Sequence, residues 1–144
     1  MLTKVAIASD HAGYNLKTYI LNNLVEDVIV NDFGTNSTES CDFPDYASKV
    51  CQYILENQGY KGILICGSGV GMSIAANKFS GIRAANVTDE ITTIQSVEHN
   101  NVNVLCLGAN NVDNETANNL ISAFLSANFS KEDRYLRRIN KLTN

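Results

Sequence analysis

Residues 61–81 predict a buried strand, a glycine-rich turn and a helix in immediate succession. Ile63–Ile65 is a continuous apolar run, β-branched at two of its three positions, as expected of a strand buried on both faces. The chain then breaks into the alternating glycines of residues 67–71. Ile74–Ala76 resumes an apolar pattern that we expect to form a helix packed closely on the sheet. Such a unit is typical of α/β proteins with a parallel sheet.

The turn in this unit has the features of an anion-binding site. Unpaired backbone N–H groups gather at the N-terminus of a helix and favour negative charge there. Cys66 lies where the strand gives way to the turn, and a helix end favours the thiolate form of a cysteine so placed. We therefore predict a thiolate base at Cys66 beside an oxyanion cradle made by the amides of Gly67, Ser68, Gly69, Val70 and Gly71.

The rest of the chain alternates in the same way. Further strands are predicted at residues 5–8, 28–30, 82–87 and 102–107. Apolar residues at helical spacing predict helices whose inward faces carry Leu16, Tyr19, Ile20 and Leu24; Ala47, Val50, Cys51, Ile54 and Leu55; Ile91, Ile94 and Val97; and Ala117, Leu120, Ile121, Phe124 and Leu125. A basic helix is expected over 131–142. This order implies a five-stranded parallel sheet with helices on both faces.

Composition sets limits on partners and location. A chain of 144 residues without repeats or linkers predicts one domain, residues 1–144. The net charge of -4 argues against nucleic acid or an anionic membrane as the partner. The four cysteines form no CxxC pair, which favours free thiols in a reducing compartment. Without a signal-peptide pattern, and with uncharged runs shorter than the ~18 residues of a membrane span, we expect a soluble, cytoplasmic protein.

The order of elements separates two groups of candidate residues. Asp10 and His11 follow the first strand and Cys66 follows the third, so they share the carboxyl edge of the sheet, where ligands bind in such folds. His99 ends a helix that runs antiparallel to the strands, which places it near the opposite edge, about 15 Å away. If His99 acts at the same site, a second copy of the chain supplies it. This predicts a homodimer or a multiple of one.

Several common motifs do not fit. Met72 stands where the third glycine of GxGxxG and the arginine of a cysteine phosphatase would fall, and no Gly-Lys-Ser/Thr of a P-loop is present. No spacing of histidines and carboxylates indicates a metal site. An anion-binding loop remains, without a nucleotide signature.

The motifs together resemble the type B ribose-5-phosphate isomerase family, whose relatives include galactose-6-phosphate isomerase. The segments that carry the resemblance are Ser9–Gly13, Cys41–Ala47, Cys66–Gly71, Ile74–Lys78, Gly81–Ala84, Glu98–Asn100 and Asn103–Leu105. The resemblance implies a Rossmann-like α/β/α sandwich and a homodimer whose active site is shared between chains. It also implies interconversion of ribose 5-phosphate and ribulose 5-phosphate, with neither a metal nor an organic cofactor.

The resemblance also implies roles for the residues of the reaction. Cys66 is the base that moves a proton between C2 and C1; some family members use a glutamate at the position of Met72 instead. His99 opens the sugar ring, as a histidine that works as acid and base near neutral pH. Asp10 and Ser68 assist at the sugar hydroxyls. The amides of the glycine turn hold the enediolate.

Substrate binding is assigned in the same way. Asn100 binds the sugar, while His11, Arg134 and Arg138 hold the phosphate. The two arginines are four residues apart and so share one helix face. Without the resemblance, Asp10 is as easily a helix cap, His99 a C-terminal helix cation, and the basic run a solvated face.

Two departures from the family pattern leave alternatives open. Asn110 stands where relatives usually carry an arginine, which puts phosphate affinity or the preferred sugar length in question. The segment before the last helix is one residue longer than usual, so Arg137 is a substitute candidate for the phosphate. A hexose 6-phosphate isomerase, acting on allose or galactose 6-phosphate, and a non-catalytic phosphosugar-binding module are the alternative functions. The sequence leaves open whether two dimers pair further.

Overall fold

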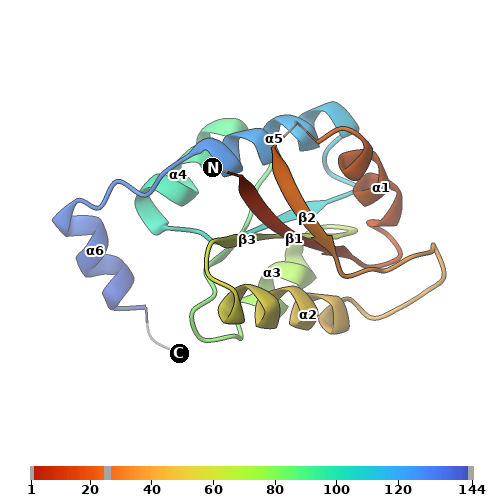
Figure 1. The fold of residues 1–144 in the computed structure, drawn as a ribbon, viewed down its shortest axis with the longest axis horizontal. Helices are drawn as coiled ribbons and strands as arrows, with labels where there is room; N and C mark the ends of the chain where they lie inside the picture. The colour runs from red at the N-terminus through yellow and green to blue at the C-terminus, as the bar shows by residue number, and fades with distance from the viewer. Residues whose placement is uncertain (1, 25–26, 143–144) are drawn as a thin grey trace.

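The protein folds as a parallel sheet between two layers of helices (Figure 1). The structure, a computed structural model, describes residues 2–24 and 27–142. Its strands are β1 (Thr3–Ser9), β2 (Val28–Asp32), β3 (Tyr60–Cys66), β4 (Ala84–Asn86) and β5 (Val104–Gly108), all parallel, in the order β2-β1-β3-β5-β4. The predicted five-stranded α/β/α sandwich is confirmed.

Helices cover both faces of this sheet. They are α1 (Tyr14–Asn22), α2 (Phe43–Glu56), α3 (Val70–Ala76), α4 (Glu90–Asn100), α5 (Asn114–Ser126) and α6 (Asp133–Asn140). Helices α1, α4 and α5 lie on one face and α2 and α3 on the other, while α6 stands away from the sheet beyond α4 (Figure 1). Helix α6 is thus the element least supported by the rest of the chain.

Each face has its own apolar core. Alternate residues of β3 divide between them, since Ile63 and Ile65 pack with α1 and α5, whereas Leu64 and Cys66 pack with α2 and α3. All residues from Gly62 to Cys66 are buried. The period of two in a strand produces this division, and burial on both sides explains the continuous apolar run.

The prediction of inward-facing side chains was wrong at three positions. Leu55, Ile91 and Ile94 are 45%, 71% and 36% exposed, and Ile74 on α3 is 58% exposed. Helix α4 instead buries Thr93, Ser96 and Val97, so its two isoleucines lie on the outer side. The strand that α3 and α4 flank, β4, is shorter than the predicted 82–87 and lies at the edge of the sheet, so less sheet surface is available to cover. The exposed isoleucines therefore form apolar surface near this edge.

Candidate active site

Cys66 is the last residue of β3, and its thiol faces the turn that follows. The side chain is buried, and the backbone N–H of Gly69 donates a hydrogen bond to Sγ at 3.1 Å. This bend requires glycine at position 69, where φ is +79° and an added Cβ would lie 2.5 Å from Asn86 Oδ1. A donor fixed by backbone geometry is suited to stabilise the thiolate of Cys66.

Ser68 and its neighbours hold the turn in place. The hydroxyl oxygen of Ser68 accepts from the Val70 amide at 3.2 Å, and its carbonyl accepts from Asn86 Nδ2 at 3.1 Å and Asn111 Nδ2 at 3.3 Å. Two of the predicted cradle amides, those of Gly69 and Val70, therefore already have side-chain acceptors. Helix α3 has no side-chain cap.

Asn110 follows β5 and contacts the same turn. Its backbone N–H donates to the Gly67 carbonyl, and that of Ala109 to the Cys66 carbonyl, both at 2.9 Å. A Cβ added to Gly67 would lie 3.1 Å from Asn110 Nδ2. The residue that replaces the arginine expected from the family pattern thus borders the site directly, with a neutral amide.

Asp10 and His11 lie at the same edge, after β1. The Asp10 amide donates to the Ile65 carbonyl at 3.1 Å, and its buried carboxylate accepts from the Gly13 amide at 3.0 Å, near the start of α1. The Cys41 amide donates to His11 Nδ1 at 3.2 Å. In the neutral imidazole, the proton is therefore on Nε2, which is free to donate elsewhere.

A buried lysine supports the loop that brings Cys41 to His11. Lys17 Nζ lies 2.7 Å from Asp32 Oδ1 and 2.7 Å from the Thr35 carbonyl oxygen, and the lysine is 1% exposed. Asp32 Oδ1 also accepts from the Gly34 amide at 2.9 Å. Sequence analysis missed Lys17, because a charged residue on an apolar helix face is normally exposed.

His99 lies at the other edge of the sheet. It precedes the end of α4 by one residue, and β5 then begins at Val104, which pairs with Gly62, whereas Cys66 pairs with Gly108 at the far end of the same strands. The four-residue offset along β3 corresponds to about 13 Å. The topology thus gives the separation that the order of elements predicts.

The predicted arginines accompany His99 and not Cys66. Arg134 and Arg138 are on α6, both exposed, with their guanidinium carbons 4.7 Å and 5.9 Å from the centroid of the Tyr135 ring. That ring stacks on His99. Arg134 also pairs with Glu132 at 3.2 Å, an exposed contact that contributes little to stability.

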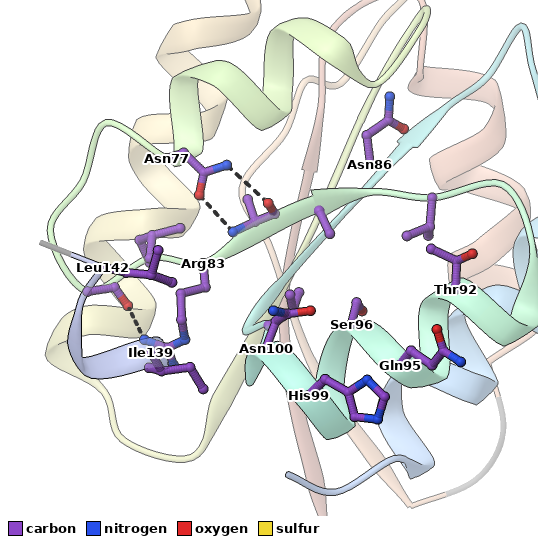
Figure 2. Close-up of a pocket in the computed structure, with 16 residues that line it drawn as sticks. Asn77, Arg83, Asn86, Thr92, Gln95, Ser96, His99, Asn100, Ile139 and Leu142 are labelled. Carbon is purple, nitrogen blue, oxygen red and sulfur yellow. Dashed lines mark hydrogen bonds between the residues drawn. The ribbon is translucent and has the colours of Figure 1, made fainter. Parts of the chain in front are cut away.

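A pocket of about 580 Å³ lies between β4, α4 and the end of α6 (Figure 2). His99 and Asn100 line it from α4, opposite the strand residues Ala84–Asn86, and Arg83, Ile139 and Leu142 close one end. Arg83 is fixed by its Nε–H, which donates to the Asn101 carbonyl at 2.7 Å, and burial lowers the pKa of its guanidinium. Asp10, His11 and Cys66 do not line this pocket.

Two of the other thiols are unsuited to act as bases. Burial raises the pKa of Cys51 to about 12 and raises that of Cys106 even further. Within the described part of the chain, no three His, Cys, Asp or Glu side chains gather to hold a metal ion. Among the same residues, no helix has the length and apolar character to cross a membrane.

Comparison with known proteins identifies the family. The sequence profile described as Ribose/Galactose Isomerase matches residues 5–142. The chain belongs to this family. Ribose-5-phosphate isomerase B of Escherichia coli is 42% identical over 143 residues, covering 99% of this chain and 95% of that protein. The resemblance drawn from the motifs is confirmed, and the chain is an isomerase of the ribose/galactose isomerase family.

Solved structures agree with this membership. The ribose 5-phosphate isomerase of Thermotoga maritima is 46% identical, with a TM-score of 0.94 over 98% of this chain and 97% of that one. Ribose-5-phosphate isomerase B from Mycoplasma genitalium, solved with bound ribulose-5-phosphate, is 39% identical, with a TM-score of 0.92 over 99% of this chain and 95% of that one. The fold found here is therefore the fold of these isomerases.

Proposed function

We propose that the chain interconverts D-ribose 5-phosphate and D-ribulose 5-phosphate through an enediolate, with Cys66 as the base. The observation that carries the proposal is the thiol at the end of β3, which accepts a hydrogen bond from the Gly69 amide in a turn built from glycines. Met72, at the position where some relatives carry a glutamate, belongs to α3 and is fully buried in the core on the α2 and α3 side of the sheet. We therefore assign the proton transfer to Cys66.

The reaction requires three proton movements after the ring has opened. The thiolate of Cys66 takes the proton from C2 of the open aldose, leaving the electron pair in an enediolate. The thiol then returns a proton to C1, while a proton passes from O2 to O1. Ser68 and Asp10 assist this last transfer, and backbone amides of residues 67–71 stabilise the enediolate; one such donor is worth about 3 kcal/mol.

Phosphate binding follows from the orientation of His11. Its Nδ1 accepts from the Cys41 amide, so its Nε2–H is available as a donor to the phosphate. Arg134 and Arg138 supply positive charge suited to bidentate contacts. Asn100, next to His99, binds the sugar.

We further propose that the protein acts as a homodimer, with His99, Asn100, Arg134 and Arg138 of one chain completing the site of the other. Two observations support this. Asp10, His11 and Cys66 lie at the opposite edge of the sheet from His99. Val70 and Ile74 on α3 are 51% and 58% exposed next to the site, and so give apolar surface that a second chain would cover. Dimers are free to pair further in this arrangement.

The first test is turnover of ribose 5-phosphate by purified protein in the presence of EDTA, compared with Cys66→Ala. We expect robust conversion by the wild type and loss of at least about 1,000-fold in the variant, because the proposed base is removed. Conversion that survives the substitution would refute the role of Cys66. Conversion that EDTA abolishes would refute a metal-independent reaction.

The shared site is tested by mixing two inactive variants. Cys66→Ala and His99→Asn homodimers each lack one residue at both sites, but a mixed dimer has one intact site. Refolding the two variants together should recover about a quarter of wild-type activity, because half of the dimers are mixed. Failure to recover activity, in a mixture shown by mass to contain mixed dimers, would place both residues in one chain's site.

A six-carbon substrate is the second candidate, favoured by Asn110. The side chain of Asn110, which lies beside Gly67, is shorter than the arginine it replaces. Comparing kcat/KM on ribose 5-phosphate with that on allose and galactose 6-phosphates separates the two. A higher value on a hexose phosphate would make this the physiological substrate class.

A further inference from the structure

Tyr135 is the buried residue of α6, a helix otherwise exposed or partly exposed. Its side chain is 8% exposed, and its ring lies parallel to the imidazole of His99, with 4.4 Å between centroids and 12° between planes. This is the distance of stacked aromatic rings, which attract one another beyond the effect of area burial. The contact joins α6 to the end of α4.

The same ring is also the contact of both arginines. The guanidinium carbons of Arg134 and Arg138 lie 4.7 Å and 5.9 Å from its centroid, within the range of cation–π attraction. Tyr135 therefore touches His99 and both arginines, three of the residues that the proposed dimer delivers to the partner's site.

A second contact joins the segment before α6 to α4. The Ser130 amide donates to the Glu98 carbonyl at 3.0 Å, which anchors the chain before the helix. An eight-residue helix has little stability of its own. The placement of its arginines therefore depends on its packing, and Tyr135 is the side chain of α6 that is buried against α4.

We propose that Tyr135 is a positioning residue that holds His99, Arg134 and Arg138 in a fixed arrangement. The residue that opens the sugar ring and the residues that bind the phosphate then enter the partner's site together. The proposal deepens the proposed function and rests on it. The aromatic ring, and not the hydroxyl, performs this role, because the contacts with all three residues are made by the ring.

The kinetic test separates ring opening from proton transfer. Ribulose 5-phosphate is an open-chain ketose, because its O5 is esterified and cannot close a furanose ring. At saturating ketose, exchange of its C1 protons with D2O therefore needs Cys66 but no ring opening. For Tyr135→Leu we expect turnover of ribose 5-phosphate to fall about 100-fold, because His99 is misplaced, while this exchange stays within about 3-fold of wild type.

Two conservative variants serve as matched controls. Tyr135→Phe keeps the ring without the hydroxyl, and Tyr135→His replaces it with a smaller aromatic ring; each should retain turnover within about 3-fold. Equal loss in Tyr135→Phe and Tyr135→Leu, or equal loss of turnover and exchange in Tyr135→Leu, would overturn the proposal. Tyr135→Met, also apolar and not aromatic, replaces Tyr135→Leu if that variant does not fold.

Proton NMR of His99 tests the stacking on Tyr135 without an activity measurement. The chain has only two histidines, so the imidazole protons of His99 are identified by comparison with a His11→Asn variant. Stacking on Tyr135 shifts them upfield by ring current, and the shift should persist in Tyr135→Phe and vanish in Tyr135→Leu. An unshifted wild type would overturn the stack itself. A shifted wild type that neither isomerises nor exchanges protons would instead refute the proposed function and leave the positioning of His99 established.

Discussion

The two halves of the candidate site are built in different ways. At the carboxyl edge, Cys66 and the turn after it are positioned by backbone hydrogen bonds and by Gly69, whose positive φ favours glycine. At the other edge, His99 and the arginines are positioned by side-chain contacts on the ends of two helices. The residues of the first half lie together within one chain. In the proposed dimer, the second half belongs to the site of the other chain.

The position of the pocket also separates the two halves. It lies beside His99 and Asn100, although the proposed base is not among its lining residues. In an enzyme whose site is complete within one chain, the base and the substrate cavity coincide. Their separation here agrees with the proposed shared site, in which the cavity of one chain lies against the carboxyl edge of the other.

The largest expected effect comes from breaking the contact between chains. Ile74→Glu puts a carboxylate in the exposed apolar surface of α3, where the proposed dimer would bury it without a partner. We expect dimer affinity to fall by at least about 100-fold, or ~3 kcal/mol, with loss of turnover at low protein concentration. Sedimentation and activity measured over a dilution series give both quantities.

The matched control is Ile29→Glu, the same change at an isoleucine 39% exposed on β2, the strand at the far end of the sheet from β4. It should leave both the dimer and its turnover intact. A folded Ile74→Glu monomer with full activity would show that one chain holds the complete site and would refute the proposed sharing of the site between two chains.

The next effect tests how the carboxyl edge is supported. Lys17→Met removes the buried ammonium that joins Asp32 to the Thr35 carbonyl. The carboxylate and the carbonyl lose their partner, so the free energy of unfolding should fall by about 3 kcal/mol, as measured in urea. The KM for the sugar phosphate should rise as well, because the loop that brings the Cys41 amide to His11 begins here.

Lys49→Met provides the comparison for Lys17→Met. Lys49 is exposed on α2 and contacts only the face of Tyr46, at 4.9 Å, among the contacts of the described residues. Its loss should change the free energy of unfolding by less than about 1 kcal/mol. Equal effects of the two substitutions would mean that the buried ion pair does not support the loop.

The contrast between the two halves also explains what the sequence could predict. The strand, the glycine turn and the cysteine follow from local rules of periodicity and backbone conformation, so the chain order alone placed Asp10, His11 and Cys66 together. The separation of His99 followed from topology. Lys17 and Tyr135 were missed because their roles depend on tertiary contacts, and the outward turn of Ile91 and Ile94 because periodicity defines a stripe but not which side it faces.

A smaller effect, on the KM for the sugar phosphate, is expected from substitutions of Asn110. Asn110→Arg places a cation beside Gly67, which also lies next to Ala12, the residue that follows His11. The KM for ribose 5-phosphate should fall about 5-fold, ~1 kcal/mol, and the gain should shrink with added salt. Asn110→Gln lengthens the side chain without charge and should not reproduce the gain. The same fall in KM with glutamine would assign the effect to size and not to charge.

The smallest effect concerns the start of the helix that carries His99. Asp89 caps α4 by accepting from the Thr92 amide at 2.8 Å, and this hydrogen bond lowers the pKa of the Asp89 carboxyl below its ordinary value of 3.8. A pKa depressed by folding gives stability that is present above the unfolded pKa and is lost as pH falls through the folded pKa. The Tm of Asp89→Ala should therefore be slightly lower than that of wild type at neutral pH, and the difference should fade below about pH 4.

Asp89→Asn keeps an acceptor without the charge, so it should retain most of the cap and show little of this pH dependence. A difference between wild type and Asp89→Ala that stays constant down to pH 2 would mean that the charge of Asp89 does not stabilise α4, and that this end of the helix is held by packing alone.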